Sequence, residues 1–245
     1  MRQTKPTLAS ALLTCLCLLS SHWISPAKGA EPVPTSLQPQ NRSLQAVGTL
    51  RVPSSKWIDG RKVHHFEDCS ATLVATGRRP IIVTAWHCLE DYDDLSRPIR
   101  FSVTLDSGEI LMREARRLAD GGGMHADWAV LQLTAPVYKV TPLRAHPGAA
   151  DPHREISLAG FVRGGGEDGS NRTLSHDPSC RILSQGATSS DTDCRAVKGA
   201  SGGAVIQRGA SGLPYLCGVV SRGDGRRLSI FVPIDSFRSE LNRYL

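Results

Sequence analysis

Apolar residues of this chain come in short runs separated by turn residues. The runs of the first half cover 46–50, 71–74, 81–83, 99–103 and 129–133, and those of the second half cover 156–159, 204–206, 215–220 and 228–232. Runs this short and rich in β-branched residues predict strands. The Pro-containing stretch 136–147 separates the two series. The pattern therefore predicts two all-β halves, 44–140 and 141–245, built as sandwiches or as barrels.

The tail from Asp235 to Leu245 has a different pattern. Asp235 is a capping residue type, and Phe237, Leu241 and Leu245 recur at helical spacing. We expect a C-terminal helix that packs on the second half.

The first thirty residues have the pattern of an export signal. A positively charged start precedes an apolar run from about Leu8 to Ile24. Small residues favour cleavage after Ala27 or Ala30, and the run is too short and too polar for a stable membrane span. A lipid anchor on a cysteine of the run is the alternative, although the residues before both cysteines fit that signal poorly. We expect a secreted or periplasmic protein without stable membrane insertion.

The composition of the chain after the signal predicts a flexible start and argues against binding of nucleic acid. Residues 31–43 are rich in Pro, Gln and Ser, which predicts a flexible lead-in or a pro-segment. Loss of residues 1–30 lowers the formal net charge from +6 to +3, because that segment holds three basic residues and no acid. No run of Lys and Arg stands out, so we expect no nucleic acid partner.

A serine lies in a glycine-rich segment, Gly199-Ala200-Ser201-Gly202-Gly203. A serine hydroxyl becomes a useful nucleophile only beside a base and near backbone N–H groups directed at the developing oxyanion. Glycines permit the sharp turn that this arrangement needs. Ser201 is therefore a candidate nucleophile, although an ordinary turn between strands has the same pattern.

A histidine and an aspartate each lie at the end of an apolar strand. His87 follows the run 81–83 and precedes Cys88, where a disulfide would hold a general base rigidly. Asp127 precedes the run 129–133, whose apolar surroundings suit an aspartate that orients a histidine. Taken singly, His87 is better explained as a packed turn histidine, and Asp127 can also be explained as an ordinary turn residue before a strand.

Together, in the order His, Asp, Ser, these segments resemble the TAAHC, DIALL and GDSGGP signatures of the chymotrypsin-like serine proteases. The matching residues are TAWHC at 84–88, DWAVL at 127–131 and GASGGA at 199–204. Other folds with this triad present its residues in other orders. The resemblance covers about 47–245 and implies two packed six-stranded antiparallel β-barrels, with the site in the cleft between them.

The resemblance implies a secreted serine endopeptidase that cleaves protein or peptide substrates through an acyl-enzyme, as a monomer without a cofactor or metal. The backbone N–H groups of Gly199 and Ser201 would form the oxyanion hole. Ser221 would touch the aspartate, and Ser221, Arg222 and Gly223 would bind the substrate backbone. Arg195 would lie at the base of the primary pocket and favour an acidic side chain, unless it points to solvent.

Five cysteines follow the signal, which in an oxidising compartment suggests two disulfides and one thiol. The resemblance pairs Cys69 with Cys88. It also pairs Cys180 with Cys194, as in some bacterial relatives. Cys217 would then be a buried free thiol.

Two positions depart from the family pattern. Ala200 stands where animal digestive members carry an aspartate that pairs with the N-terminus freed by activation cleavage. We therefore expect activity without such a terminus. Trp86 replaces the usual small residue before the histidine, and its bulk must find space near the cleft.

Three other interpretations use the same residues. A non-catalytic binding module with this fold is one, although such proteins usually lose a triad member. A zinc site at His64, His65, Cys69, His87 and Cys88 is another, but these spacings match no common zinc pattern. A serine esterase would share the Gly-x-Ser-x-Gly pattern, yet its fold places the aspartate and histidine after the serine.

Overall fold

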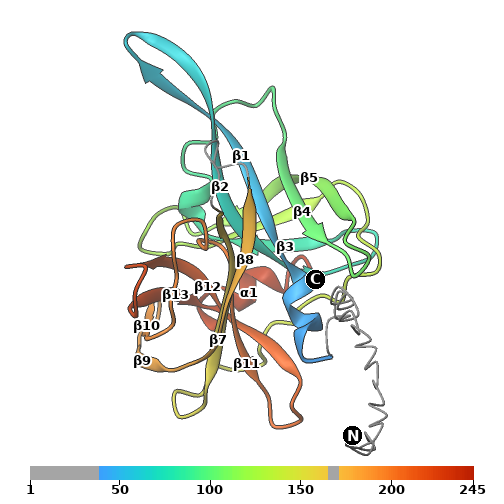
Figure 1. Ribbon diagram of the computed structural model, residues 1–245, viewed down its shortest axis with the longest axis vertical. Coiled ribbons are helices and arrows are strands. Elements are labelled where there is room, and N and C mark those ends of the chain that lie inside the picture. The colour runs from blue at the N-terminus through green and yellow to red at the C-terminus, as the bar shows by residue number, and fades with distance from the viewer. Residues whose placement is uncertain (1–38, 165–170) are drawn as a thin grey trace, which may run out of the picture. The chain divides into compact units, whose positions relative to one another are not determined.

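The computed structural model describes residues 39–164 and 171–245, which form an all-β protein (Figure 1). The expected signal 1–30 and most of the expected lead-in 31–43 lie outside these residues. The end of the lead-in belongs to a 3₁₀ helix, η1 (Pro39–Ala46), because Leu44 and Ala46 are buried in the core. No helix in this part of the chain is long and apolar enough to cross a membrane.

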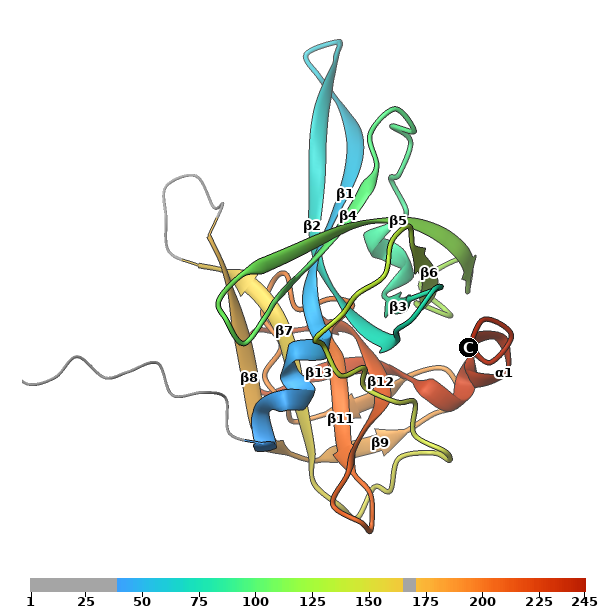
Figure 2. The ribbon, with the colours of Figure 1, turned by 90° about the vertical axis from the view of Figure 1, so that its right-hand side faces the viewer.

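Six antiparallel strands of the first half close into a barrel, as expected, in the order β1-β2-β3-β6-β5-β4. The strands are β1 (Val47–Ile58), β2 (Arg61–Ala75), β3 (Ile81–Thr84), β4 (Ile99–Thr104), β5 (Ile110–Asp120) and β6 (Ala129–Leu133). β4 alternates, with Ile99, Phe101 and Val103 buried, so one face of the strand fills the barrel. Figure 2 shows the β1–β2 hairpin extending beyond the barrel.

The second half is a seven-stranded curled sheet and not a closed six-stranded barrel. Its order is β8-β7-β11-β12-β13-β10-β9. The strands are β7 (Ile156–Arg163), β8 (Arg172–Cys180), β9 (Ile182–Gln185), β10 (Ser190–Thr192), β11 (Ala204–Arg208), β12 (Pro214–Gly223) and β13 (Ser229–Pro233). Only Arg181 separates the edge strands β8 and β9, so the chain itself joins the two edges. The sheet therefore curls around without a hydrogen-bonded seam.

The C-terminal helix is shorter than expected. A 3₁₀ turn, η3 (Ile234–Ser236), precedes α1 (Arg238–Leu241), and no side chain caps the start of α1. Phe237 is buried and stacks on Trp128, with ring centroids 4.9 Å apart. Trp128 directly precedes β6, so the tail packs also against the first barrel, beside Asp127.

Candidate active site

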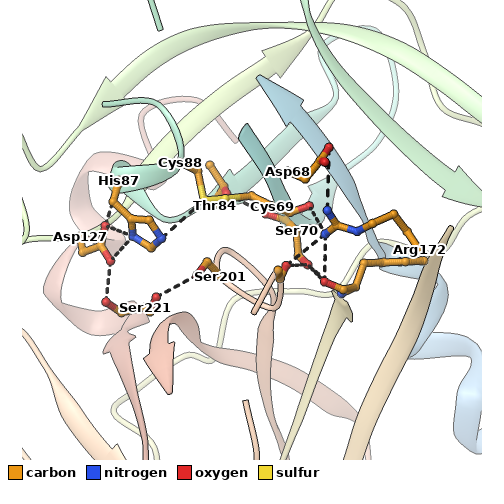
Figure 3. The surroundings of a disulfide bond; sticks show 12 residues. Asp68, Cys69, Ser70, Thr84, His87, Cys88, Asp127, Arg172, Ser201 and Ser221 are labelled. Carbon is orange, nitrogen blue, oxygen red and sulfur yellow. Dashed lines mark hydrogen bonds and ion pairs between the residues drawn. A yellow bond between two sulfur atoms is a disulfide. The ribbon is translucent and has the colours of Figure 1, made fainter. Parts of the chain in front are cut away.

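The three candidate catalytic residues come together where the two halves meet. β3 and β6 are antiparallel neighbours, with Thr84 opposite Ala129. Because β3 ends where β6 begins, His87 in η2 (Trp86–Cys88) and Asp127 lie at the same edge of the barrel. Ser201 lies in the turn that leads into β11 of the second sheet. Figure 3 shows Ser221 linking Ser201 to Asp127 of the His87–Asp127 pair.

Asp127 is a buried carboxylate, 1% exposed, that receives three hydrogen-bond donors. Nδ1 of His87 lies 2.9 Å from Oδ2, and the backbone N–H of His87 donates to Oδ1 at 2.9 Å. The Ser221 hydroxyl donates to Oδ2 at 2.5 Å. A carboxylate on Nδ1 favours the tautomer with the proton on that nitrogen and leaves Nε2 free to accept one. Asp127 thus fixes both the orientation and the tautomer of His87.

Ser201 reaches the same site with its hydroxyl turned to one side. Its Oγ donates to the carbonyl oxygen of Ser221 at 3.1 Å. Among the described residues, Ser201 Oγ makes no hydrogen bond with His87, whose Nε2 lies 3.9 Å from Cys88 Sγ. A hydrogen bond from Ser201 to His87 would require rotation of the Ser201 side chain.

The turn before Ser201 directs two N–H groups away from the protein's own acceptors. Gly199 has φ +100°, a conformation that glycine adopts readily, and the Ala200 N–H closes the turn onto the carbonyl of Val197 at 2.9 Å. In the described part of the chain, the N–H groups of Gly199 and Ser201 donate to no acceptor. These are the two donors that the resemblance assigns to the oxyanion hole.

Two disulfide bonds, Cys69–Cys88 and Cys180–Cys194, are present as expected. The first joins β2 to the residue after His87 and so fixes η2. Sulfur and nitrogen atoms of Cys69, Cys88 and His87 lie within 4.8 Å of one another. Zinc ligation by cysteine requires a thiolate, and a disulfide has none. The zinc interpretation loses its two cysteine ligands for this reason.

Arg195 lies on the surface, the second of its two expected positions. Its Nε donates to the carbonyl of Gly225 at 3.1 Å, and it borders a surface hollow of about 380 Å³. Beside Arg195, the Gly225 N–H donates to the Ala196 carbonyl at 3.1 Å. A Cβ at Gly223 would lie 2.6 Å from Ala196 O and 2.8 Å from Ser229 Oγ. Residues 223–225 thus lie directly against Ala196.

The other residues expected to bind substrate border the site. Ser221 and Arg222 line an open hollow of about 260 Å³ together with Met124, His125 and Asp127. Ser221 is buried and Arg222 is exposed. This hollow adjoins the carboxylate that orients the histidine, so a peptide lying along the end of β12 has space on this side of the site.

The loop after η2 is fixed by a second buried carboxylate, Asp94. It accepts hydrogen bonds from Ser96 and Arg97, each at 2.5 Å, and its Oδ2 lies 2.9 Å from Nδ1 of His64. The Ser96 hydroxyl, together with the charges of Arg97 and His64, lowers the pKa of Asp94 to about 2. Asp94 therefore ties the loop that follows His87 to the base of the β1–β2 hairpin.

Two residues that the sequence analysis did not single out contact the turn before Ser201. Ser70 Oγ donates to the carbonyl of Gly199 at 2.8 Å, and Nη2 of Arg172 lies 3.3 Å from the same oxygen. Burial lowers the pKa of the Arg172 guanidinium, and Asp68 partly offsets that effect. Ser70 adjoins a cysteine of the family pattern, which was the only available signal, and Arg172 had none.

Cys217 is a fully buried thiol whose Sγ lies 3.3 Å from the carbonyl oxygen of Val205. Burial raises its pKa to about 12. Because the thiolate is the reactive form, we expect no alkylation of Cys217 by iodoacetamide at mildly alkaline pH while the protein is folded. Mass spectrometry of the Cys217 peptide should show full alkylation after denaturation. Rapid labelling of the native protein would contradict this burial.

Comparisons with known proteins agree with this architecture. The structure is similar to the protease domain of MamO from Magnetospirillum magneticum in its apo form, with a TM-score of 0.54 and 16% identity over 81% of this chain and 97% of that chain. It is also similar to the thermostable serine protease AL20 from an extremophilic microorganism, with a TM-score of 0.58 and 18% identity over 82% and 97% of the two chains. At these identities the likeness shows the fold. Comparison with curated proteins finds no match.

A barrel packed on a curled sheet is the architecture of the chymotrypsin-like serine proteases, and the sequence match is specific to the same class. Residues 69–211 match the trypsin-like peptidase domain family. The chain belongs to this family and is a trypsin-like peptidase domain.

Proposed function

We propose that this protein is an exported serine endopeptidase whose triad is His87, Asp127 and Ser201. The observation that carries the proposal is the buried Asp127 carboxylate, which lies 2.9 Å from His87 Nδ1 and is linked through Ser221 to Ser201 in a glycine turn. The two disulfides fit a protein of an oxidising compartment.

In the proposed reaction, Ser201 Oγ attacks the carbonyl carbon of a peptide bond while His87 Nε2 takes the hydroxyl proton. The N–H groups of Gly199 and Ser201 stabilise the negative charge on the former carbonyl oxygen. His87 then gives the proton to the nitrogen of the leaving amine as the C–N bond breaks, which leaves an acyl group on Ser201. A water molecule then attacks this ester while His87 takes its proton. His87 returns the proton to Ser201 Oγ as the bond between Oγ and the acyl carbon breaks and the acid leaves.

The Asp127 carboxylate and the Ser221 hydroxyl support each step through their contacts with each other and with His87. The carboxylate stabilises the imidazolium that forms when His87 takes the proton. Ser221 links the two halves of the site, because its hydroxyl donates to Asp127 and its carbonyl accepts from Ser201. We place an extended peptide along residues 221–223, next to the hollow lined by Met124 and His125.

Labelling with a fluorophosphonate probe tests this function. Wild type should become labelled at Ser201 and hydrolyse a peptide substrate, whereas Ser201→Ala and His87→Ala should do neither. Ser211→Ala, in the exposed turn between β11 and β12, is the matched serine control and should behave as wild type. A folded wild type that is not labelled would favour the non-catalytic binding module.

A further inference from the structure

Ser70 connects the first barrel to both ends of the turn that carries Ser201. Its backbone N–H donates to the Ser201 carbonyl at 2.7 Å. Its hydroxyl accepts from the Phe161 N–H at 2.7 Å and donates to the Gly199 carbonyl at 2.8 Å. Its own carbonyl accepts from the Thr84 hydroxyl at 2.7 Å. Ser70 is fully buried, so its polar groups are satisfied by protein atoms alone.

Arg172, which Figure 3 shows near Ser70 and Cys69, also contacts the Gly199 carbonyl. Nη2 lies 3.0 Å from the carbonyl oxygen of Phe161, 3.2 Å from that of Cys69 and 3.3 Å from that of Gly199. Its side chain is only 11% exposed, with Asp68 3.9 Å from Nη1. Hydrogen bonds from a cation are about twice as strong as neutral ones. The positive charge of Arg172 thus lies beside backbone carbonyl groups from both halves of the molecule.

These contacts determine where the two unused N–H groups point. The Gly199 carbonyl belongs to the peptide plane that lies between the N–H of Gly199 and the N–H of Ser201. Ser70 and Arg172 hold this peptide plane through its carbonyl oxygen. The peptide planes on either side, which carry the N–H groups of Gly199 and Ser201, can therefore rotate less. An oxyanion hole works only when its two donors converge on one point before the reaction starts.

The side chain at position 200 contributes no charge to this arrangement. Ala200 is buried against Gly160, where a Cβ would lie 2.8 Å from the Ala200 Cα. A freed N-terminal amino group that reached this position would find no carboxylate at residue 200 to pair with. The turn is instead held by groups that are in place as soon as the chain has folded.

We propose that Arg172 and Ser70 are positioning residues that hold the Gly199–Ser201 turn in its oxyanion-binding conformation without a freed N-terminus. This inference rests on the proposed function. Neither residue touches the substrate, and both act through the orientation of the turn. The same network explains why the chain tolerates alanine where other family members carry an aspartate.

The first test compares Arg172→Met, Arg172→Lys and Ser70→Ala with Arg116→Met, a control at an exposed arginine of β5. Loss of the arginine should lower kcat about 100-fold, the order of losing one oxyanion donor, with little change in KM. Lysine should restore part of kcat, since it keeps the charge but not the fork of donors. Added guanidinium ion should restore part of the activity of Arg172→Met. A folded Arg172→Met with wild-type kcat, or a loss that neither lysine nor guanidinium reverses, would overturn the proposal.

A second measurement does not depend on activity. Amide hydrogen exchange of residues 197–203 should become faster in Arg172→Met and Ser70→Ala and stay unchanged in Arg116→Met. Acetylation of the α-amine should leave the kcat of wild type unchanged. Unlabelled Ser201 in folded wild type would refute the proposed function, whereas unchanged exchange, or a kcat that needs the free amine, would refute this inference. If Arg172→Met does not fold, Ser70→Ala carries the test, because it removes only one hydroxyl.

Discussion

Asp127→Asn is expected to lower kcat by about four orders of magnitude, as loss of the aspartate's charge and tautomer control does in this type of triad. The asparagine amide fits the same space, but its NH₂ group can turn its hydrogen toward His87 Nδ1. The imidazole would then carry its proton on Nε2 and be unable to accept one from Ser201. Steady-state hydrolysis of a peptide ester, measured across the pH range in which histidine titrates, checks this result.

Asp94→Asn is a matched control for this substitution. Asp94 is also buried and also lies 2.9 Å from Nδ1 of a histidine, His64, but it lies outside the proposed machinery. Its substitution should lower the melting temperature, because hydrogen bonds from Ser96 and Arg97 lose a charged acceptor, and leave kcat close to the wild-type value. Equal losses of kcat in both variants would show that Asp127 acts only through stability.

The sequence predicted those strands whose side chains are buried. β3 is buried at every position and β6 at all but one, and both appear as apolar runs. β8, β9 and β10 were not predicted, because most of their side chains are exposed or polar. The sequence could not predict the number of strands in the second half, because the strands at and next to the edges of this sheet have no run of apolar residues.

The candidate site shows the same division. His87, Asp127 and Ser201 could be found because each lies in a short motif whose order is informative. Arg172 could not, because it contacts Cys69 and Gly199 only through tertiary packing, 103 and 27 residues away along the chain. The contact of Gly223 and Gly225 with Ala196 likewise depends on how one loop lies against another. Position along a sequence places a side chain on an element and does not determine its rotamer or its distant contacts.

Gly202→Ala is expected to destabilise the protein by about 2–5 kcal/mol, the sum of left-handed backbone strain and overpacking. Gly202 has φ +81°, and a Cβ there would lie 2.1 Å from both Ser70 O and Thr84 Oγ1. These two atoms hydrogen-bond to each other within the first barrel, and the Ser70 N–H donates to the Ser201 carbonyl. An added methyl group should therefore push the Ser201 turn away from the barrel that carries the histidine. Urea unfolding measures the loss of stability, and hydrolysis by the folded fraction measures the displacement.

Gly60→Ala separates the two causes of this loss. Gly60, at the tip of the β1–β2 hairpin, has a similar φ of +73°, but a Cβ there would meet nothing within 4 Å. Its substitution should cost only the backbone strain, about 1–2 kcal/mol, and leave kcat unchanged. If both variants lose the same free energy of unfolding, the close contact at Ser70 and Thr84 carries no cost. The turn before β11 would then be able to shift away from Ser70 and Thr84 and accommodate the added methyl group.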